Sequence, residues 1–208
     1  MDRERKFRLG ILGSGKGSNF VAVAAACARG GVPAEVALVI SDVVEAGILM
    51  QAKERGIPAR HIAPGQFRTK LDDEAEVKCI TALHEARVDL VVLAGFMRIL
   101  KGDFLKAFPG RVINIHPSLL PSFPGLEAWK QALDYGVKFT GVTVHFVDQG
   151  VDTGAIIAQQ TVPVLDHDTA ETLHARIQAA EHQLYPAAIR SLAEGRCEVR
   201  GRRVVTKS

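Results

Sequence analysis

The chain has 208 residues, of which 47% are hydrophobic and 24% charged, and its formal net charge is +3 at pH 7. This composition is close to that of an average soluble globular protein, and glycine and proline are too few for a fibrous or low-complexity chain. No window approaches the ~20 apolar residues of a membrane span. The mild positive charge is compatible with an anionic small-molecule substrate, whereas clustered Lys and Arg would better signal nucleic-acid binding.

The three cysteines, Cys27, Cys79 and Cys197, are scattered along the chain. Their odd, sparse number argues against a disulfide framework, and the absence of a CxxC pair or of histidines at ligand spacing argues against structural zinc. We therefore expect a reducing compartment and a soluble, cytoplasmic protein that needs no metal. Nucleic acid and membrane are not expected as partners.

Apolar segments of strand length alternate with helical patterns over the first two thirds of the chain. The strands are expected at Phe7–Leu12, Val36–Ile40, Ala59–Ile62, Leu90–Ala94 and Val112–His116. The helices are expected at Ser18–Ala28, Ala46–Arg55 and Asp72–Ala86. This β-α-β-α order with fully apolar strands predicts an α/β fold, a doubly wound and mostly parallel sheet with helices on both faces.

After Pro117 the pattern changes. A short helix is expected first, then two strands, then a long amphipathic helix, at Leu126–Tyr135, Thr140–Val147, Ala155–Val164 and from Asp168 onward. Asp168 and Glu171 stand at capping-box spacing, and Pro186 predicts a kink in the long helix. The tail, CEVRGRRVV, is typical of a small hairpin turning at Gly201. With no internal repeat and no linker, one domain is expected.

The segment GSGKGSN, Gly13–Asn19, directly follows the first strand and opens the first helix. Glycines in this position let backbone N–H groups close around an anion at the helix N-terminus. The segment does not match the nucleotide-binding pattern GxxxxGK[ST], because Gly17 stands where the pattern requires Ser or Thr. It does not match the dinucleotide-binding pattern GxGxxG either, because Ser18 stands at the third glycine. A site for one phosphate, held by Gly17, Ser18 and Asn19, is the functional interpretation. A tight turn with a serine cap is the alternative.

In the strand VINIH, alternation places Asn114 and His116 on one face. Ligands bind at the carboxyl ends of strands in open α/β sheets, and Pro117 favours an extended His116 at that end. A carboxamide and an imidazole projecting together can donate hydrogen bonds to an oxygen that becomes negative, which defines an oxyanion site. Two satisfied buried polar groups are the equally weighted alternative.

The loop DQGVDTG offers two carboxylates, Asp148 and Asp152. A carboxylate near His116 would favour the charged imidazolium, a better donor to an oxyanion and one able to release a proton. Aspartates in a glycine-rich loop are more often turn formers. His145, on the preceding strand, could line the same region or belong to the core.

The segment LAGFMRIL, Leu93–Leu100, follows the fourth predicted strand. Its apolar side chains could line a pocket for a flat ring of a ligand; they are Phe96, Met97, Ile99 and Leu100. Core packing at a strand-to-helix turn explains the same residues if the segment is taken alone.

Taken together, GSGKGSN, LAGFMRIL, NIHPSLLP followed by FPG, GVTVHFV and the DxG loop resemble the glycinamide ribonucleotide formyltransferase family of purine synthesis, in its order and spacing. The resemblance runs from about Arg8 to Arg196. It implies a Rossmann-like formyltransferase fold over residues 1–208, with a phosphate-binding half of about 1–110 and a catalytic, folate-binding half of about 111–208. It also implies 10-formyltetrahydrofolate as co-substrate, glycinamide ribonucleotide as substrate, and no metal. A monomer or a homodimer is compatible with it.

The resemblance assigns roles position by position. It makes Asn114, His116 and Asp152 the catalytic residues. The ribonucleotide contacts are Gly17, Ser18, Asn19 and Glu181. The folate contacts are Lys70, Met97, Arg98, Ile99, Leu100, Asn114 and Asp148, where Lys70 takes the place of an arginine that the family often has.

The implied reaction is direct formyl transfer. The amine of the ribonucleotide attacks the formyl carbon, Asn114 and protonated His116 stabilise the oxyanion, and Asp152 keeps His116 charged and helps to relay the proton to N10. Methionyl-tRNA formyltransferase and formyltetrahydrofolate deformylase share part of the pattern. The first carries an additional C-terminal domain for tRNA and the second an N-terminal regulatory domain, and neither domain is expected here. The alternatives that stay open are hydrolysis of formyltetrahydrofolate and a non-catalytic module that binds a sugar phosphate.

Overall fold

A computed structural model describes residues 5–207 of the chain. The chain divides into two compact units, Met1–Val112 and Ile113–Ser208, and each is described here by itself.

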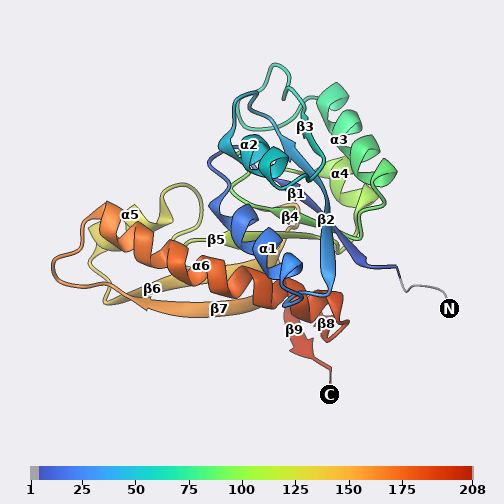
Figure 1. Ribbon diagram of the computed structural model, residues 1–208. Helices are drawn as coiled ribbons and strands as arrows, with labels where there is room; N and C mark the ends of the chain where they lie inside the picture. The colour runs from blue at the N-terminus through green and yellow to red at the C-terminus, as the bar shows by residue number, and fades with distance from the viewer. Residues whose placement is uncertain (1–4, 208) are drawn as a thin grey trace. The chain divides into compact units, whose positions relative to one another are not determined.

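The first unit is built on a parallel sheet. Its strands are β1 (Phe7–Leu12), β2 (Ala34–Ser41), β3 (Ala59–His61) and β4 (Leu90–Leu93). They pair in the order β3-β2-β1-β4, and each pairing is parallel (Figure 1). The helices are α1 (Ser18–Ala28), α2 (Gly47–Glu54), α3 (Asp73–Glu85) and α4 (Gly102–Ala107). The predicted alternation of strand and helix is confirmed.

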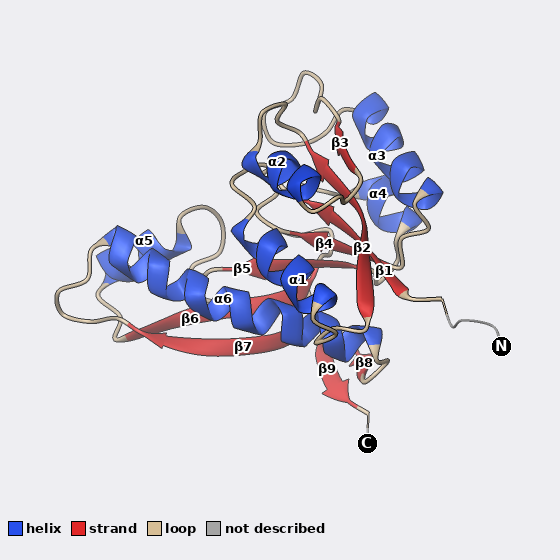
Figure 2. Cartoon of the chain, viewed as in Figure 1, coloured by secondary structure: helices blue, strands red, loops and turns tan. Residues whose placement is uncertain are grey.

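Helices cover both faces of this sheet, α1 beside α2 and α3 beside α4 (Figure 2). A glycine makes the close packing of α3 possible, because a Cβ on Gly10 would lie 2.4 Å from the side chain of Leu83. Large side chains such as Phe20, Ile40 and Phe104 are fully buried between the layers. Helix α4 was not predicted, because its six residues are too few to show a helical period.

The second unit is mainly antiparallel. Its strands are β5 (Val112–His116), β6 (Phe139–Phe146), β7 (Ile156–Pro163), β8 (Cys197–Arg200) and β9 (Arg203–Thr206). Their order is β5-β6-β7-β9-β8, and only the pairing of β7 with β9 is parallel. Helix α5 (Ala128–Tyr135) precedes β6, and α6 (Ala170–Ala193) lies along β6 and β7. The predicted antiparallel additions are confirmed.

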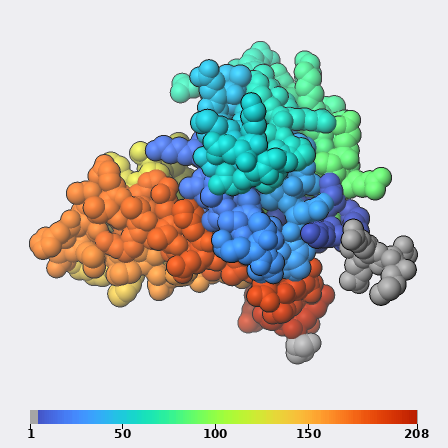
Figure 3. Space-filling model, viewed as in Figure 1, coloured from blue at the N-terminus to red at the C-terminus, as the bar shows by residue number. Residues whose placement is uncertain are grey.

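Two details of this unit bear on the sequence predictions. The hairpin of β8 and β9 turns at Gly201 as expected and lies at the surface, in red in Figure 3. Helix α6 runs through Pro186 without interruption.

The predicted capping box at Asp168 and Glu171 is wrong by one residue. Thr169 is the N-cap, and its side chain and that of Thr172 exchange hydrogen bonds with each other's backbone N–H groups. Asp168 cannot serve as the cap because its carboxylate accepts two bonds from the guanidinium of Arg176, at 2.7 and 2.8 Å, and one from the backbone of Leu165.

Candidate active site

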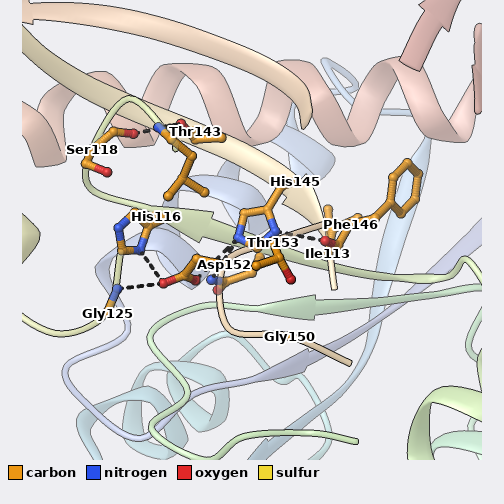
Figure 4. A network of polar contacts seen from close by, with 12 residues as sticks. Ile113, His116, Ser118, Gly125, Thr143, His145, Phe146, Gly150, Asp152 and Thr153 are labelled. Carbon is orange, nitrogen blue, oxygen red and sulfur yellow. Dashed lines mark hydrogen bonds and ion pairs between the residues drawn. The ribbon is translucent and has the colours of Figure 1, made fainter. Parts of the chain in front are cut away.

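Strand register in the second unit gathers the predicted catalytic side chains. Asn114 lies opposite His145 and His116 opposite Thr143 in the antiparallel pair of β5 and β6. Directly opposed residues project to the same face of a sheet, so these four side chains form one row. Figure 4 shows His116, Thr143 and His145 of this row, with Asp152 beside the two histidines.

His116 is held through both ring nitrogens. Nε2 lies 2.8 Å from the carbonyl oxygen of Phe123, and Nδ1 lies 3.4 Å from the Oδ2 atom of Asp152. The residue is buried. Since a carbonyl and a carboxylate only accept, the doubly protonated ring is the one state that presents an N–H to each.

Asp152 adopts a left-handed backbone, with φ of 55°, a conformation that aspartate tolerates better than most residues. This turn aims its carboxylate at the histidines. Oδ2 accepts a hydrogen bond of 2.8 Å from the backbone N–H of Gly125, and Oδ1 lies 3.7 Å from Nε2 of His145. The structure thus brings Asp152 to His116, as the sequence predicted, and adds His145 to the cluster.

His145, for which the sequence left two roles open, connects Asn114 with Asp152. Its Nδ1 lies 2.8 Å from the carbonyl oxygen of Phe146, so this nitrogen carries the proton. Nε2, 3.4 Å from Nδ2 of Asn114, is then the acceptor of the carboxamide N–H. Burial, the largest effect, lowers the pKa of His145 and favours this neutral ring, although the Phe146 carbonyl and Asp152 oppose it.

Thr143 is a residue of this row that the sequence analysis missed. Its buried hydroxyl donates to the carbonyl of Ser118 at 2.7 Å and accepts from the backbone N–H of Leu120 at 3.0 Å. These bonds fix the HPSLLP segment on β6 immediately after His116. The alternation of GVTVHF places Thr143 on the face of His145, which is the signal that could have identified it.

The carboxylate of Asp148 organises its own loop. Oδ1 accepts from the backbone N–H of Gly150 at 3.0 Å and from the hydroxyl of Thr153 at 2.6 Å. The turn-forming interpretation therefore describes Asp148, and its contact with folate stays a prediction. Asp152, four residues on, faces the histidines instead.

The predicted phosphate loop lies in the first unit. Gly17 has φ of 84° and is the N-cap of α1, with no side-chain hydrogen bond capping the helix. The alternative of a serine cap is therefore wrong. A Cβ at Gly17 would lie 2.9 Å from the backbone and side chain of Ile48 in α2, so a side chain there is opposed by both conformation and space. Ser18 and Asn19 form the first turn of α1.

The predicted folate segment also lies in the first unit. Met97 and Ile99 are exposed by 59% and 39%, whereas Leu100 is buried, and their contact with folate stays a prediction. Ile99 forms an isolated parallel bridge with Lys70, whose ammonium lies 4.2 Å from the ring centre of Phe67. Arg98 is engaged by Asp42 at 2.7 Å.

Glu181, the remaining predicted ribonucleotide contact, is a buried residue of α6 in the second unit. Among the described residues 5–207, no group of three potential metal ligands is found. None of the helices in that part of the chain is long and apolar enough to span a membrane.

Comparison with known proteins identifies the family. The formyl transferase family model matches residues 7–189. Phosphoribosylglycinamide formyltransferase of Bacillus subtilis is 41% identical over 185 residues, which cover 89% of this chain and 94% of that protein. The crystal structure of glycinamide ribonucleotide transformylase 1 from Symbiobacterium toebii superposes with a TM-score of 0.94 at 48% identity, covering 99% of this chain and 96% of that one.

Two further relatives differ in length. The trifunctional purine biosynthetic protein adenosine-3 of Drosophila melanogaster is 46% identical over 92% of this chain, but the match spans only 14% of that protein. A formyltetrahydrofolate deformylase from Pseudomonas syringae has a TM-score of 0.90 at 26% identity, and the match covers 67% of its chain.

The fold is that of a formyl transferase, and the chain belongs to the formyl transferase family. The relative that it matches almost end to end in Bacillus subtilis is a phosphoribosylglycinamide formyltransferase, so the resemblance inferred from the motifs is confirmed.

Proposed function

We propose that the chain transfers the formyl group of 10-formyltetrahydrofolate to the amine of glycinamide ribonucleotide, giving formylglycinamide ribonucleotide and tetrahydrofolate in purine synthesis. The observation that carries the proposal is the row of Asn114, His116 and His145. The carboxylate of Asp152 lies against both histidines (Figure 4). The full-length relatives support the choice of substrates.

The row supplies the groups that acyl transfer needs. The substrate amine attacks the formyl carbon, forming a C–N bond and placing the negative charge on the formyl oxygen. The carboxamide N–H of Asn114 and an N–H of His116 donate to that oxygen, which stabilises charge as it develops. Because both nitrogens of His116 already face acceptors, one of them exchanges its partner for the substrate. The bond to N10 then breaks, and the amine proton passes to N10 with the help of Asp152.

The remaining residues serve binding. The N-terminal turn of α1, with Gly17, Ser18 and Asn19, presents backbone N–H groups and a favourable dipole to the ribonucleotide phosphate. Glu181 contacts the same substrate. The folate is held by Lys70, Asp148 and the segment Met97–Leu100. The reaction needs no resident metal, and three free thiols favour a reducing, cytoplasmic location.

Substitution of the row tests the mechanism. His116→Ala should lower kcat for formyl transfer by about 10²–10³-fold, the range for loss of an oxyanion donor, with little change in KM. Asp152→Asn keeps an acceptor for the N–H of Gly125 but removes the charge beside His116, so it should also lower kcat. Folate product is followed by absorbance with both substrates present, and His167→Ala, at an exposed histidine, is the matched control.

The same assay separates the alternatives when each substrate is omitted in turn. Release of tetrahydrofolate without the ribonucleotide identifies a hydrolase. Ribonucleotide binding without turnover identifies a binding module. Full turnover in both His116→Ala and Asp152→Asn contradicts the mechanism.

A further inference from the structure

Three polar residues of the first unit, Ser14, Asp42 and Arg98, form a chain of contacts centred on the buried carboxylate of Asp42. The carboxylate of Asp42, at the end of β2, accepts from the hydroxyl of Ser14 at 2.5 Å and from Nε of Arg98 at 2.7 Å. The Asp42 side chain is 2% exposed and that of Arg98 17%. A charge buried to this degree is tolerated when it is paired and hydrogen-bonded, which is the case for both oxygens here.

Ser14 attaches this pair to the phosphate loop. Ser14 is the second residue of GSGKGSN, and its hydroxyl also accepts a hydrogen bond of 2.9 Å from the backbone N–H of Met97. Its own backbone N–H donates to the carbonyl of Gly95 at 3.0 Å. The start of the phosphate loop is therefore bonded to the start of the predicted folate segment.

Arg98 also bonds to a third segment, residues 67–69. Its Nη1 donates to the carbonyl oxygens of Phe67, at 3.1 Å, and Arg68. The backbone N–H of Ile99 donates to the carbonyl of Thr69 at 2.8 Å. One guanidinium thus holds the residues before Lys70 against Met97–Leu100.

We propose that Ser14, Asp42 and Arg98 are positioning residues, here called the Ser14–Asp42–Arg98 bridge. The bridge fixes the phosphate loop, Gly13–Asn19, in position relative to the two predicted folate segments, residues 67–70 and Met97–Leu100. The inference rests on the proposed function for the identity of the two ligands. It reassigns the side chain of Arg98, because its Nε and Nη1 groups already donate to Asp42 and to two backbone carbonyls of this unit. The folate is met instead by the exposed side chains and the backbone that Arg98 arranges.

Kinetics of four variants distinguish a bridge from a direct contact. Ser14→Ala and Arg98→Met should each raise KM for both substrates, on the order of tenfold, because displaced segments misplace both ligands. The double variant should be little worse than the worse single one, since both remove the same arrangement. Arg98→Lys should restore only part of the loss, because one ammonium cannot reproduce the forked geometry. Arg60→Met is the control, at an arginine whose pair with Glu85 is exposed.

A direct folate contact predicts a different result. Arg98→Met would then raise KM for folate alone, and Ser14→Ala would leave that KM unchanged. The double variant would show the KM for folate of Arg98→Met, together with whatever separate effect Ser14→Ala has on KM for the ribonucleotide. That outcome overturns the bridge.

Hydrogen exchange tests the bridge without reference to activity. The amides of Met97 and Ile99 should exchange faster in Ser14→Ala and Arg98→Met, while the amide of Val91, which donates to Arg111, keeps its wild-type rate. Unchanged exchange at Met97 in Ser14→Ala contradicts the bridge. A wild-type protein that shows no formyl transfer contradicts the proposed function alone, because the exchange result still stands.

Discussion

His145 and Asp152 owe their behaviour to the hydrogen-bond partners around them rather than to their residue types. The Phe146 carbonyl fixes the tautomer of His145, and the left-handed backbone of Asp152 directs its carboxylate toward both histidines. A neutral His145 accepts from Asn114, so it orients the carboxamide without competing with His116 for the charge of Asp152. In the proposed mechanism the row therefore contains two histidines with different tasks: His116 donates to the oxyanion and His145 orients Asn114.

Replacement of His145 separates these tasks. His145→Phe keeps the bulk of the ring but removes the acceptor for Asn114, so kcat should fall by about tenfold to a hundredfold while KM for the ribonucleotide changes little. Wild-type kcat should also decline in acid as His145 becomes protonated, and this part of the pH profile should be absent from the variant. A pH–rate profile of both proteins measures it. An unchanged kcat at neutral pH would leave His145 a core residue.

At the scale of elements, the start of α6 shows how one ion pair fixes a helix boundary. Arg176, nearly two turns into the helix, reaches back to Asp168, and the bonds that this carboxylate accepts, first those from Arg176, hold its pKa far below the ordinary value for aspartate. The cap passes to Thr169 as a result. A capping pattern read from the sequence identifies the turn, and the tertiary partner decides which residue within it is the cap.

The lowered pKa of Asp168 makes a stability prediction with a definite sign. The unfolded chain binds a proton at higher pH than the folded one, so the pair stabilises fully above the ordinary aspartate pKa of about 3.9 and less as the pH falls below it. Asp168→Asn should lower the Tm by a few degrees at pH 7, and the difference from wild type should shrink in acid. Thermal unfolding across this range measures it. A difference that grows in acid contradicts the assignment.

At the scale of the whole molecule, the sequence predicts the elements well and their contacts poorly. Periodicity locates nearly every strand and long helix, because burial of apolar faces is a local pattern. The pairing of Asn114 with His145 depends on strand register, and the contact of Asp42 with Arg98 joins residues 56 positions apart. Neither is encoded in a local pattern. The roles proposed for Asn114, His116 and Asp152 come from motif resemblance, while Thr143 and the bridge could be found only in the structure.

The three thiols allow a prediction for the whole chain. Burial raises the pKa of Cys27 to about 11 and that of Cys79 to about 12, so both are almost entirely protonated near neutral pH. Because the thiolate is the reactive form, alkylation by iodoacetamide should be slow in the folded protein and slowest at Cys79. Peptide mass spectrometry over time, with denatured protein as the control, measures it. Labelling of Cys79 at the denatured rate would contradict its burial.

The proposed phosphate site at the start of α1 would link folding to ligand supply. Gly17 offers no side chain to cap the helix, so a phosphate bound there would satisfy the free backbone N–H groups of the first turn. A ligand that binds only the folded state adds stability of about 2.7 kcal/mol at one hundred times its Kd. The Tm should therefore rise with ribonucleotide concentration in wild type and far less in Gly17→Val, in a thermal shift titration. Equal shifts in both would remove the loop from the site.

If that link holds, the substrate acts as a folding partner. The fraction of molecules that are transiently open, and with it their exposure to proteolysis, falls whenever the ribonucleotide accumulates. A helix left uncapped by its own sequence would in this way tie the lifetime of the enzyme to the demand for its reaction.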